Sequence, residues 1–228
     1  MNRREIGAWA GMIGSALFVL VFTIEGILRP GYDARSMFVS ELSLGPRGWI
    51  QIINFLVTGV LFLLFAWGVA AEFHQGKASK AGPIILAIIG ICLFFSGPFV
   101  MDPASTPRSE WSGHGIVHQL LGAVVFTLAP ISTFVFLRRF RADPKWQPLQ
   151  WWTLAVGIIT VTAVVLLRVG PVQPPAAPNA FNAWSGLIQR ALLVPFMAWI
   201  FTFAWRLQRV SQVEESAQPQ GTSLAAGK

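Results

Sequence analysis

The chain has 228 residues, of which 27 are charged, 17 of them Lys or Arg and 10 Asp or Glu. This share of 12% is about half of the roughly 25% found in soluble globular domains, and 54% of the residues are hydrophobic. A soluble fold with so few charges would expose large apolar patches, and a disordered chain would be far less hydrophobic. The single cysteine excludes a disulfide framework and a cysteine-based zinc or iron–sulfur site. The composition therefore indicates a polytopic membrane protein.

The net charge of +7 does not indicate a nucleic-acid partner. Basic patches that bind nucleic acid cluster on one face of a soluble domain. The Lys and Arg residues here form short clusters between apolar runs, which is the arrangement that membrane topology requires. We therefore expect the lipid bilayer as a partner and no nucleic acid.

In chain order, six stretches are long enough to cross the membrane. About 30 Å of hydrocarbon requires about 20 mostly apolar residues in a helix, and neighbouring helices tolerate internal prolines such as Pro130 and Pro195. The predicted fold is all-α, a compact bundle of six transmembrane helices within residues 1–210, followed by a polar tail, 211–228, that we expect to be disordered. The predicted spans are Ile6–Leu28, Ile50–Ala71, Gly82–Met101, Ile116–Leu137, Leu149–Val169 and Gly186–Leu207.

The basic residues predict the orientation of the spans. Eleven of the 17 Lys and Arg residues lie on the side that holds both termini, and the positive-inside rule places that side in the cytoplasm. We therefore predict cytoplasmic N- and C-termini and longer loops that face outward. In the first outward loop, Asp33 precedes Met37–Leu44, which predicts a short capped helix at the interface.

Several loop motifs resemble a known family. They include Arg29-Pro30-Gly31-Tyr32-Asp33, Val39-Ser40-Glu41-Leu42, Leu44 to Trp49, Asn54 with Thr58-Gly59, Met101-Asp102-Pro103, His114-Gly115-x-x-His118 and Gln189-Arg190. Over about residues 5–208 the chain resembles the bacterial membrane-protein family catalogued as domain of unknown function 998. The resemblance implies a six-helix protein of the bacterial cytoplasmic membrane and no settled activity.

The strongest candidate for chemistry is the pair His114 and His118 at the start of the fourth span. Side chains four residues apart lie about 40° apart on one helix face, a spacing that suits two ligands of one metal ion. A zinc site, or a site for another divalent transition metal, would need a third ligand, which either Asp102 or Glu41 could supply. The competing interpretation is a polar structural cluster at the membrane interface.

Other polar residues near the outward side are candidates for catalysis or binding. Glu41 or Asp102 could act as general base, Ser40 as nucleophile, and Arg190 as the group that holds an anion such as a lipid phosphate. Ionisable residues in spans are costly and therefore suggest function. Glu25 could bind a substrate, or it could form an ion pair with Arg29, four residues on.

Asn54 is a further binding candidate, and it shares a helix face with Gln51 and Thr58. Such a polar stripe could instead hydrogen-bond a neighbouring helix. Arg190 likewise could pair with Asp102 or Glu41 rather than contact a ligand. These residues leave three functions open. The chain is a metal-assisted hydrolase or transferase acting on a lipid or amphiphile, or a non-enzymatic carrier or lipid-binding protein, or an accessory protein in membrane assembly.

Overall fold

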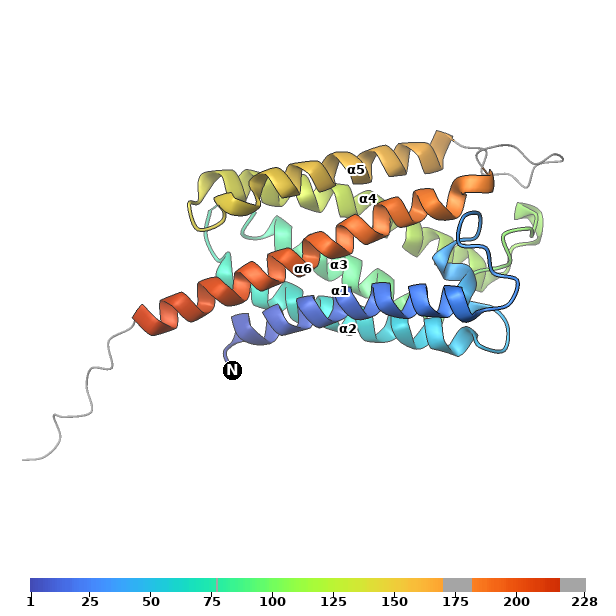
Figure 1. Ribbon diagram of the computed structural model, residues 1–228, viewed down its shortest axis with the longest axis horizontal. Coiled ribbons are helices and arrows are strands. Elements are labelled where there is room, and N and C mark those ends of the chain that lie inside the picture. The colour runs from blue at the N-terminus through green and yellow to red at the C-terminus, as the bar shows by residue number, and fades with distance from the viewer. Residues whose placement is uncertain (77, 170–181, 218–228) are drawn as a thin grey trace, which may run out of the picture.

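The computed structural model describes residues 1–76, 78–169 and 182–217 (Figure 1). In this part of the chain the fold is all-α, with no strands. Four short 3₁₀ helices are interspersed, namely η1 (Val39–Ser43), η2 (Arg108–Glu110), η3 (Gln147–Leu149) and η4 (Asn182–Trp184). The six α-helices are α1 (Arg3–Leu28), α2 (Gly48–Glu72), α3 (Ala81–Phe95), α4 (Gly113–Ala142), α5 (Gln150–Val169) and α6 (Ser185–Ala217).

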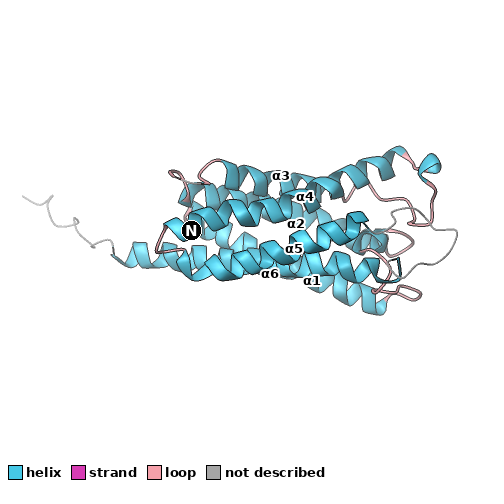
Figure 2. Cartoon of the chain, turned by 90° about the horizontal axis from the view of Figure 1, so that it is seen from above, coloured by secondary structure: helices cyan, strands magenta, loops and turns pink. Residues whose placement is uncertain are grey.

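The six helices form a closed ring. Each helix contacts the next in chain order, and α6 returns to contact α1. All run roughly along the long axis of the molecule, so the ring has two ends (Figures 1 and 2). We call the end that holds the N-terminus and the C-terminal end of α6 the terminus end. The opposite end, with the segments Arg29–Arg47 and Ser96–Ser112, is the long-loop end.

Five of the helices are long and apolar enough to cross a membrane, which makes the chain a multi-pass membrane protein. The prediction of six full spans is therefore only partly confirmed. The third span was expected over Gly82–Met101, but α3 has 15 residues and ends at Phe95. At about 1.5 Å per residue this is about 22 Å, less than the hydrocarbon thickness.

The end of α3 follows from three consecutive residues. The Ser96 hydroxyl donates to the Cys92 carbonyl at 2.8 Å and competes with the continuing helix. Gly97 has a low helix propensity, and Pro98 has no N–H to donate. The segment after Phe95 therefore leaves the helix and exposes backbone carbonyls, a point that matters for the two histidines below.

Close helix packing in the ring depends on glycines. A Cβ atom on Gly7 of α1 would lie 2.6 Å from the Cα of Gly68 of α2, and one on Gly59 would lie 2.5 Å from the backbone nitrogen of Phe94 of α3. Small residues let transmembrane backbones approach in this way. The glycines of α1 therefore serve contacts within this chain.

Aromatic side chains fill the ring toward the terminus end. The centroids of the Phe136 and Phe203 side chains lie 4.8 Å apart, and Phe140 stacks on Trp146 with their centroids 5.4 Å apart. All four side chains are fully buried. The ring is thus a packed core at this end, and a functional site has to be sought toward the other end.

Charged residues tie the helices together at the terminus end. Arg4 of α1 pairs with Glu72 of α2 at 3.0 Å and with Glu214 of α6, which also pairs with Lys145. These contacts accompany an unexpectedly long α6. Residues 211–217, expected in a disordered tail, are helical, whereas residues 218–228 lie outside the described residues.

Candidate functional site

The first loop at the long-loop end folds inward and covers that end of the ring. Its short helix spans Val39–Ser43, and the side chains of Val39 and Leu42 are buried. The helix was predicted over Met37–Leu44 with Asp33 as its cap. Instead, Glu41 accepts the Phe38 N–H at 2.8 Å and caps it, while Asp33 accepts the Arg35 N–H at 3.0 Å in the preceding turn.

Glu41 is therefore a capping residue in this structure. Glu41 is 9% exposed, and this burial raises the pKa of its carboxyl group above the ordinary value for glutamate, against the opposing effects of the Phe38 N–H and Arg190. Glu41 is not one of the described residues that line the cavity discussed below. The loop conformation, rather than chemistry, accounts for its contacts.

Helix α6 anchors this loop. The Gln189 side-chain carbonyl accepts the Val39 N–H at 2.7 Å. Arg190 donates to the carbonyls of Ala34 at 2.8 Å and Met37 at 3.0 Å, and it also bonds the Tyr32 hydroxyl. Arg190, predicted to bind an anionic ligand or a carboxylate, thus holds backbone carbonyls of the first loop.

The loop and α6 approach so closely that a glycine is required. A Cβ on Gly186 would lie 2.4 Å from the Met37 carbonyl oxygen. In the same region the Leu187 N–H donates to the Arg35 carbonyl at 3.0 Å. The start of α6 and the first loop therefore form one packed unit.

Glu25 holds the other side of the loop. Its carboxylate is 3% exposed and accepts from Arg47 at 2.6 and 3.0 Å and from Arg29 at 2.9 and 3.2 Å. Arg29 also donates to the Leu44 carbonyl at 2.8 Å. The structure thus contains the ion pair with Arg29 and adds a second arginine that the sequence did not suggest.

The two histidines bind consecutive carbonyls after the end of α3. His114 Nδ1 lies 3.3 Å from the Pro98 carbonyl oxygen, and His118 Nδ1 lies 2.7 Å from that of Phe99. The four-residue spacing therefore matches two backbone acceptors that the early end of α3 leaves available. His118 is buried at 5% exposure, whereas His114 is exposed.

The proposed third metal ligand is also occupied. Asp102 accepts the Ser112 N–H at 2.8 Å, next to the start of α4. No group of three His, Cys, Asp or Glu residues within the described ranges is placed to hold a metal ion. The residues that the sequence suggested for zinc thus do not fit a metal centre in this arrangement.

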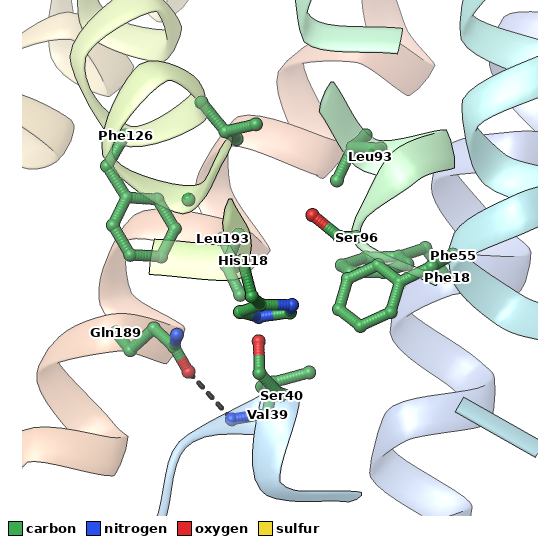
Figure 3. Close-up of a pocket in the computed structure, with 12 residues that line it drawn as sticks. Phe18, Val39, Ser40, Phe55, Leu93, Ser96, His118, Phe126, Gln189 and Leu193 are labelled. Atoms are coloured by element: carbon green, nitrogen blue, oxygen red, sulfur yellow. Dashed lines mark hydrogen bonds between the residues drawn. The ribbon is translucent and has the colours of Figure 1, made fainter. Parts of the chain in front are cut away.

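A small cavity lies beneath the first loop, inside the ring (Figure 3). Its volume is about 30 Å³, enough for at least one water molecule. Five helices and η1 contribute to it, and no charged side chain of the described residues does. Its lining residues are Phe18, Val39, Ser40, Phe55, Leu93, Ser96, His118, Gly122, Val125, Phe126, Gln189 and Leu193.

Ser40 and His118 face each other in this cavity. In Figure 3 the Ser40 hydroxyl points toward the His118 imidazole. A carbonyl can only accept a hydrogen bond, so the contact with Phe99 places the His118 proton on Nδ1. In the neutral ring the lone pair is then on Nε2, which is the tautomer that a general base requires.

The polar stripe of α2 lies in the same half of the ring. Asn54 Nδ2 donates to the Phe18 carbonyl of α1 at 3.2 Å and to Gln51 Oε1 at 3.2 Å. Thr58 is fully buried one turn further along. The stripe thus does bond a neighbouring helix, and Asn54 contacts Phe18, a lining residue, without lining the cavity itself.

The sequence predicted these polar residues at one end of the molecule, and the structure pairs them differently. Ser40 was considered a nucleophile and His118 a metal ligand, and the structure brings them together while Glu41, Asp102 and His114 bond elsewhere. Gln189 was noted only in a motif, and Ser96 was not singled out. A helix-breaking run directly after an apolar helix was the signal that could have pointed to Ser96.

The chain was also compared with known proteins. A family model described as "Protein of unknown function (DUF998)" matches residues 12–206. No curated protein and no solved structure matches the chain. The matched range includes α2 to α5 completely, most of α1 and of α6, and every residue of the cavity. The chain therefore belongs to the family described as "Protein of unknown function (DUF998)".

Proposed function

We propose that this protein is a membrane-embedded hydrolase or acyltransferase that uses Ser40 as nucleophile and His118 as general base. The observation that carries the proposal is the Ser40 hydroxyl that points toward the His118 ring in a small cavity beneath the first loop. A serine hydroxyl is a weak nucleophile until an adjacent base takes its proton. The Phe99 carbonyl, 2.7 Å from His118 Nδ1, supplies the third group that orients such a base.

The reaction needs only groups that this chain provides, together with substrate and water. Ser40 Oγ bonds to the carbonyl carbon of an ester, and its proton passes to His118 Nε2. The ester C–O bond then breaks, and the proton passes to the leaving alcohol oxygen. Water or a second alcohol then attacks the acyl carbon and gives its proton to the same nitrogen. The bond between the acyl carbon and Ser40 Oγ breaks, and Nε2 returns the proton to Oγ, so Ser40 and His118 are regenerated.

The surroundings of the cavity favour an amphiphilic substrate. Phe18, Phe55 and Leu93 make part of the lining apolar. The cavity belongs to the long-loop end, which the positive-inside rule places on the outer face of the cytoplasmic membrane. An ester or amide of a lipid or other amphiphile in the outer leaflet matches both features.

A serine-directed fluorophosphonate probe tests the proposal on the purified full-length protein. We expect stoichiometric labelling of Ser40 in the wild type, loss of labelling in Ser40→Ala, and strongly slowed labelling in His118→Gln. Ser36→Ala is the matched control, because the Ser36 hydroxyl bonds Asp33 in the same loop. Labelling that is absent, or equal in wild type and His118→Gln when both are folded, would rule the proposal out.

The alternative is a lipid-binding protein without chemistry. It is favoured by the tight attachment of the first loop, because Arg190 and Glu25 form hydrogen bonds and ion pairs that hold this loop and are not available for catalysis. In that case the probe labels nothing, and a bound lipid copurifies with wild type and with Ser40→Ala alike. The same preparation therefore discriminates between the two functions.

A further inference from the structure

The cavity that holds Ser40 and His118 is open on the side of α4. Gly122 lines it, and a Cβ atom on Gly122 would have no neighbouring atom within 4 Å. Phe126, one turn further along α4, also lines the cavity and is only half-buried. On α6 the facing lining residues are Gln189 and Leu193. The opening thus lies between the long-loop halves of α4 and α6.

This side of α4 is not covered by α5 at that level. The two helices touch nearer the terminus end, where a Cβ on Gly157 would lie 2.8 Å from Thr133 Oγ1. Toward the long-loop end they separate, as Figure 1 shows. Gln119, on the same side of α4 as Thr133, is correspondingly exposed. Within the described residues the opening therefore continues to the outer surface of the ring.

The opening lies at the depth of hydrocarbon. Gly122 is nine residues beyond the start of α4 at Gly113, about 13 Å along the axis at about 1.5 Å per residue. The neighbouring outward side chains of α4, Leu120 and Val124, are apolar and exposed at 62% and 38%. A helix that crosses the membrane presents such residues to lipid, so a molecule that enters here comes from the bilayer and not from water.

We infer that this opening admits a hydrocarbon chain of a membrane amphiphile, whose linkage to the headgroup then lies at Ser40 and His118. The inference rests on the proposed function and names the substrate class, which is an acyl lipid of the same leaflet. The cavity itself is small, so the half-buried ring of Phe126 swings outward as the chain enters. Apolar walls at the entrance and a polar pair at the inner end match the two parts of such a molecule.

Photocrosslinking in vesicles tests this inference. The full-length protein is reconstituted in phosphatidylcholine vesicles that contain a phosphatidylcholine with a diazirine in its acyl chain, and labelled residues are identified by mass spectrometry. We expect labels on Leu193 and Phe126 in wild type. In Gly122→Leu these labels fall about tenfold, the change that corresponds to ~1.4 kcal/mol of binding free energy. Phe126→Ala, which widens the entrance, increases the label on Leu193.

Gly113→Leu is the matched control. The Cβ position of Gly113 is also free of neighbours within 4 Å, but Gly113 does not line the cavity. Both leucine variants should therefore fold, and only Gly122→Leu should block labelling. Labels confined to lipid-facing residues such as Leu120, or unchanged in Gly122→Leu, would overturn the inference.

The two proposals fail separately. Chain labelling does not need a nucleophile, so it persists in Ser40→Ala if the opening admits lipid, even when the fluorophosphonate result has excluded an enzyme. Conversely, the fluorophosphonate could label Ser40 equally in wild type and Gly122→Leu while no lipid label is found in the cavity. That result would support the proposed enzyme and contradict the lateral opening.

Discussion

Arg190 should control the attachment of the first loop to α6. Its guanidinium donates to the carbonyls of Ala34, Met37 and Gly186 and bonds the Tyr32 hydroxyl. The bond to Ala34 is exposed to water, and the Gly186 carbonyl belongs to α6 itself. The bonds to Met37 and Tyr32 are therefore the two partly buried bonds that attach the loop to α6. Hydrogen bonds of charged groups contribute about 1.5–3 kcal/mol each. We therefore expect Arg190→Ala to lower the free energy of loop opening by about 3 kcal/mol, the lower limit for two such bonds.

Limited trypsin digestion in detergent measures this opening. Arg35 is in the loop, and its side chain is 58% exposed, while its carbonyl is bonded to Leu187 in the closed loop. When opening is fast relative to cleavage, the cleavage rate follows the open population. A loss of about 3 kcal/mol then speeds cleavage after Arg35 about a hundredfold.

Two variants sharpen this measurement. Arg190→Lys keeps the charge but not the planar fork of donors, so its cleavage rate should be intermediate. Arg168→Ala removes an exposed arginine that makes no hydrogen bond to the other described residues, and it should cleave like wild type. A change of less than about threefold in Arg190→Ala, equivalent to less than ~0.7 kcal/mol, would refute the assignment of Arg190 as the loop anchor.

Three further predictions follow from the packing. Glu25→Gln should lower the free energy of unfolding by about 2–4 kcal/mol in a denaturant titration, because two arginines lose their carboxylate; an unchanged midpoint would contradict it. Burial raises the pKa of Glu41 in the folded state. The protonated carboxyl therefore stabilises the fold fully below the pKa of the unfolded chain, and this stability declines as the pH rises toward and through the folded pKa. Glu41→Gln should remove that decline in the melting temperature above pH 4.5, and equal slopes would count against it. Gly59→Ala should destabilise by about 1–3 kcal/mol through contact with Phe94, whereas Gly113→Ala, with open space, should not; equal effects would disprove the packing argument.

The fold was predictable from the sequence to the extent that the membrane dictates it. Hydrocarbon requires long apolar helices, and five of the six predicted spans correspond to helices of that kind. The predicted third span is longer than α3, because a hydropathy pattern does not show where the hydrogen bonding of a helix stops. Phe99 and Val100 continue the apolar run, but Ser96 and Pro98 end the helix before them.

The candidate site was less predictable, for a related reason. The sequence displays side chains, and its chemistry was sought by pairing them, as with His114, His118 and Asp102 around a metal. In the structure all three bond the backbone, at Pro98, Phe99 and Ser112. Which carbonyls and N–H groups lack a helical partner depends on where helices end, and that information is not in the spacing of polar residues.

The same reasoning explains why the uncharged pair is the better candidate for chemistry. An irregular loop that covers the end of a ring of helices carries backbone groups that need partners. Arg190 donates to such carbonyls directly, and Glu25 pairs with Arg29, which donates to the Leu44 carbonyl. A residue engaged in this way cannot also bind a substrate without releasing the loop. Ser40 has a hydroxyl directed into the cavity, and the bond of His118 to Phe99 leaves the lone pair of the neutral ring on Nε2. Function at this end of the molecule should therefore depend on Ser40 and His118 directly, and on the charged residues only through the position of the loop that carries Ser40.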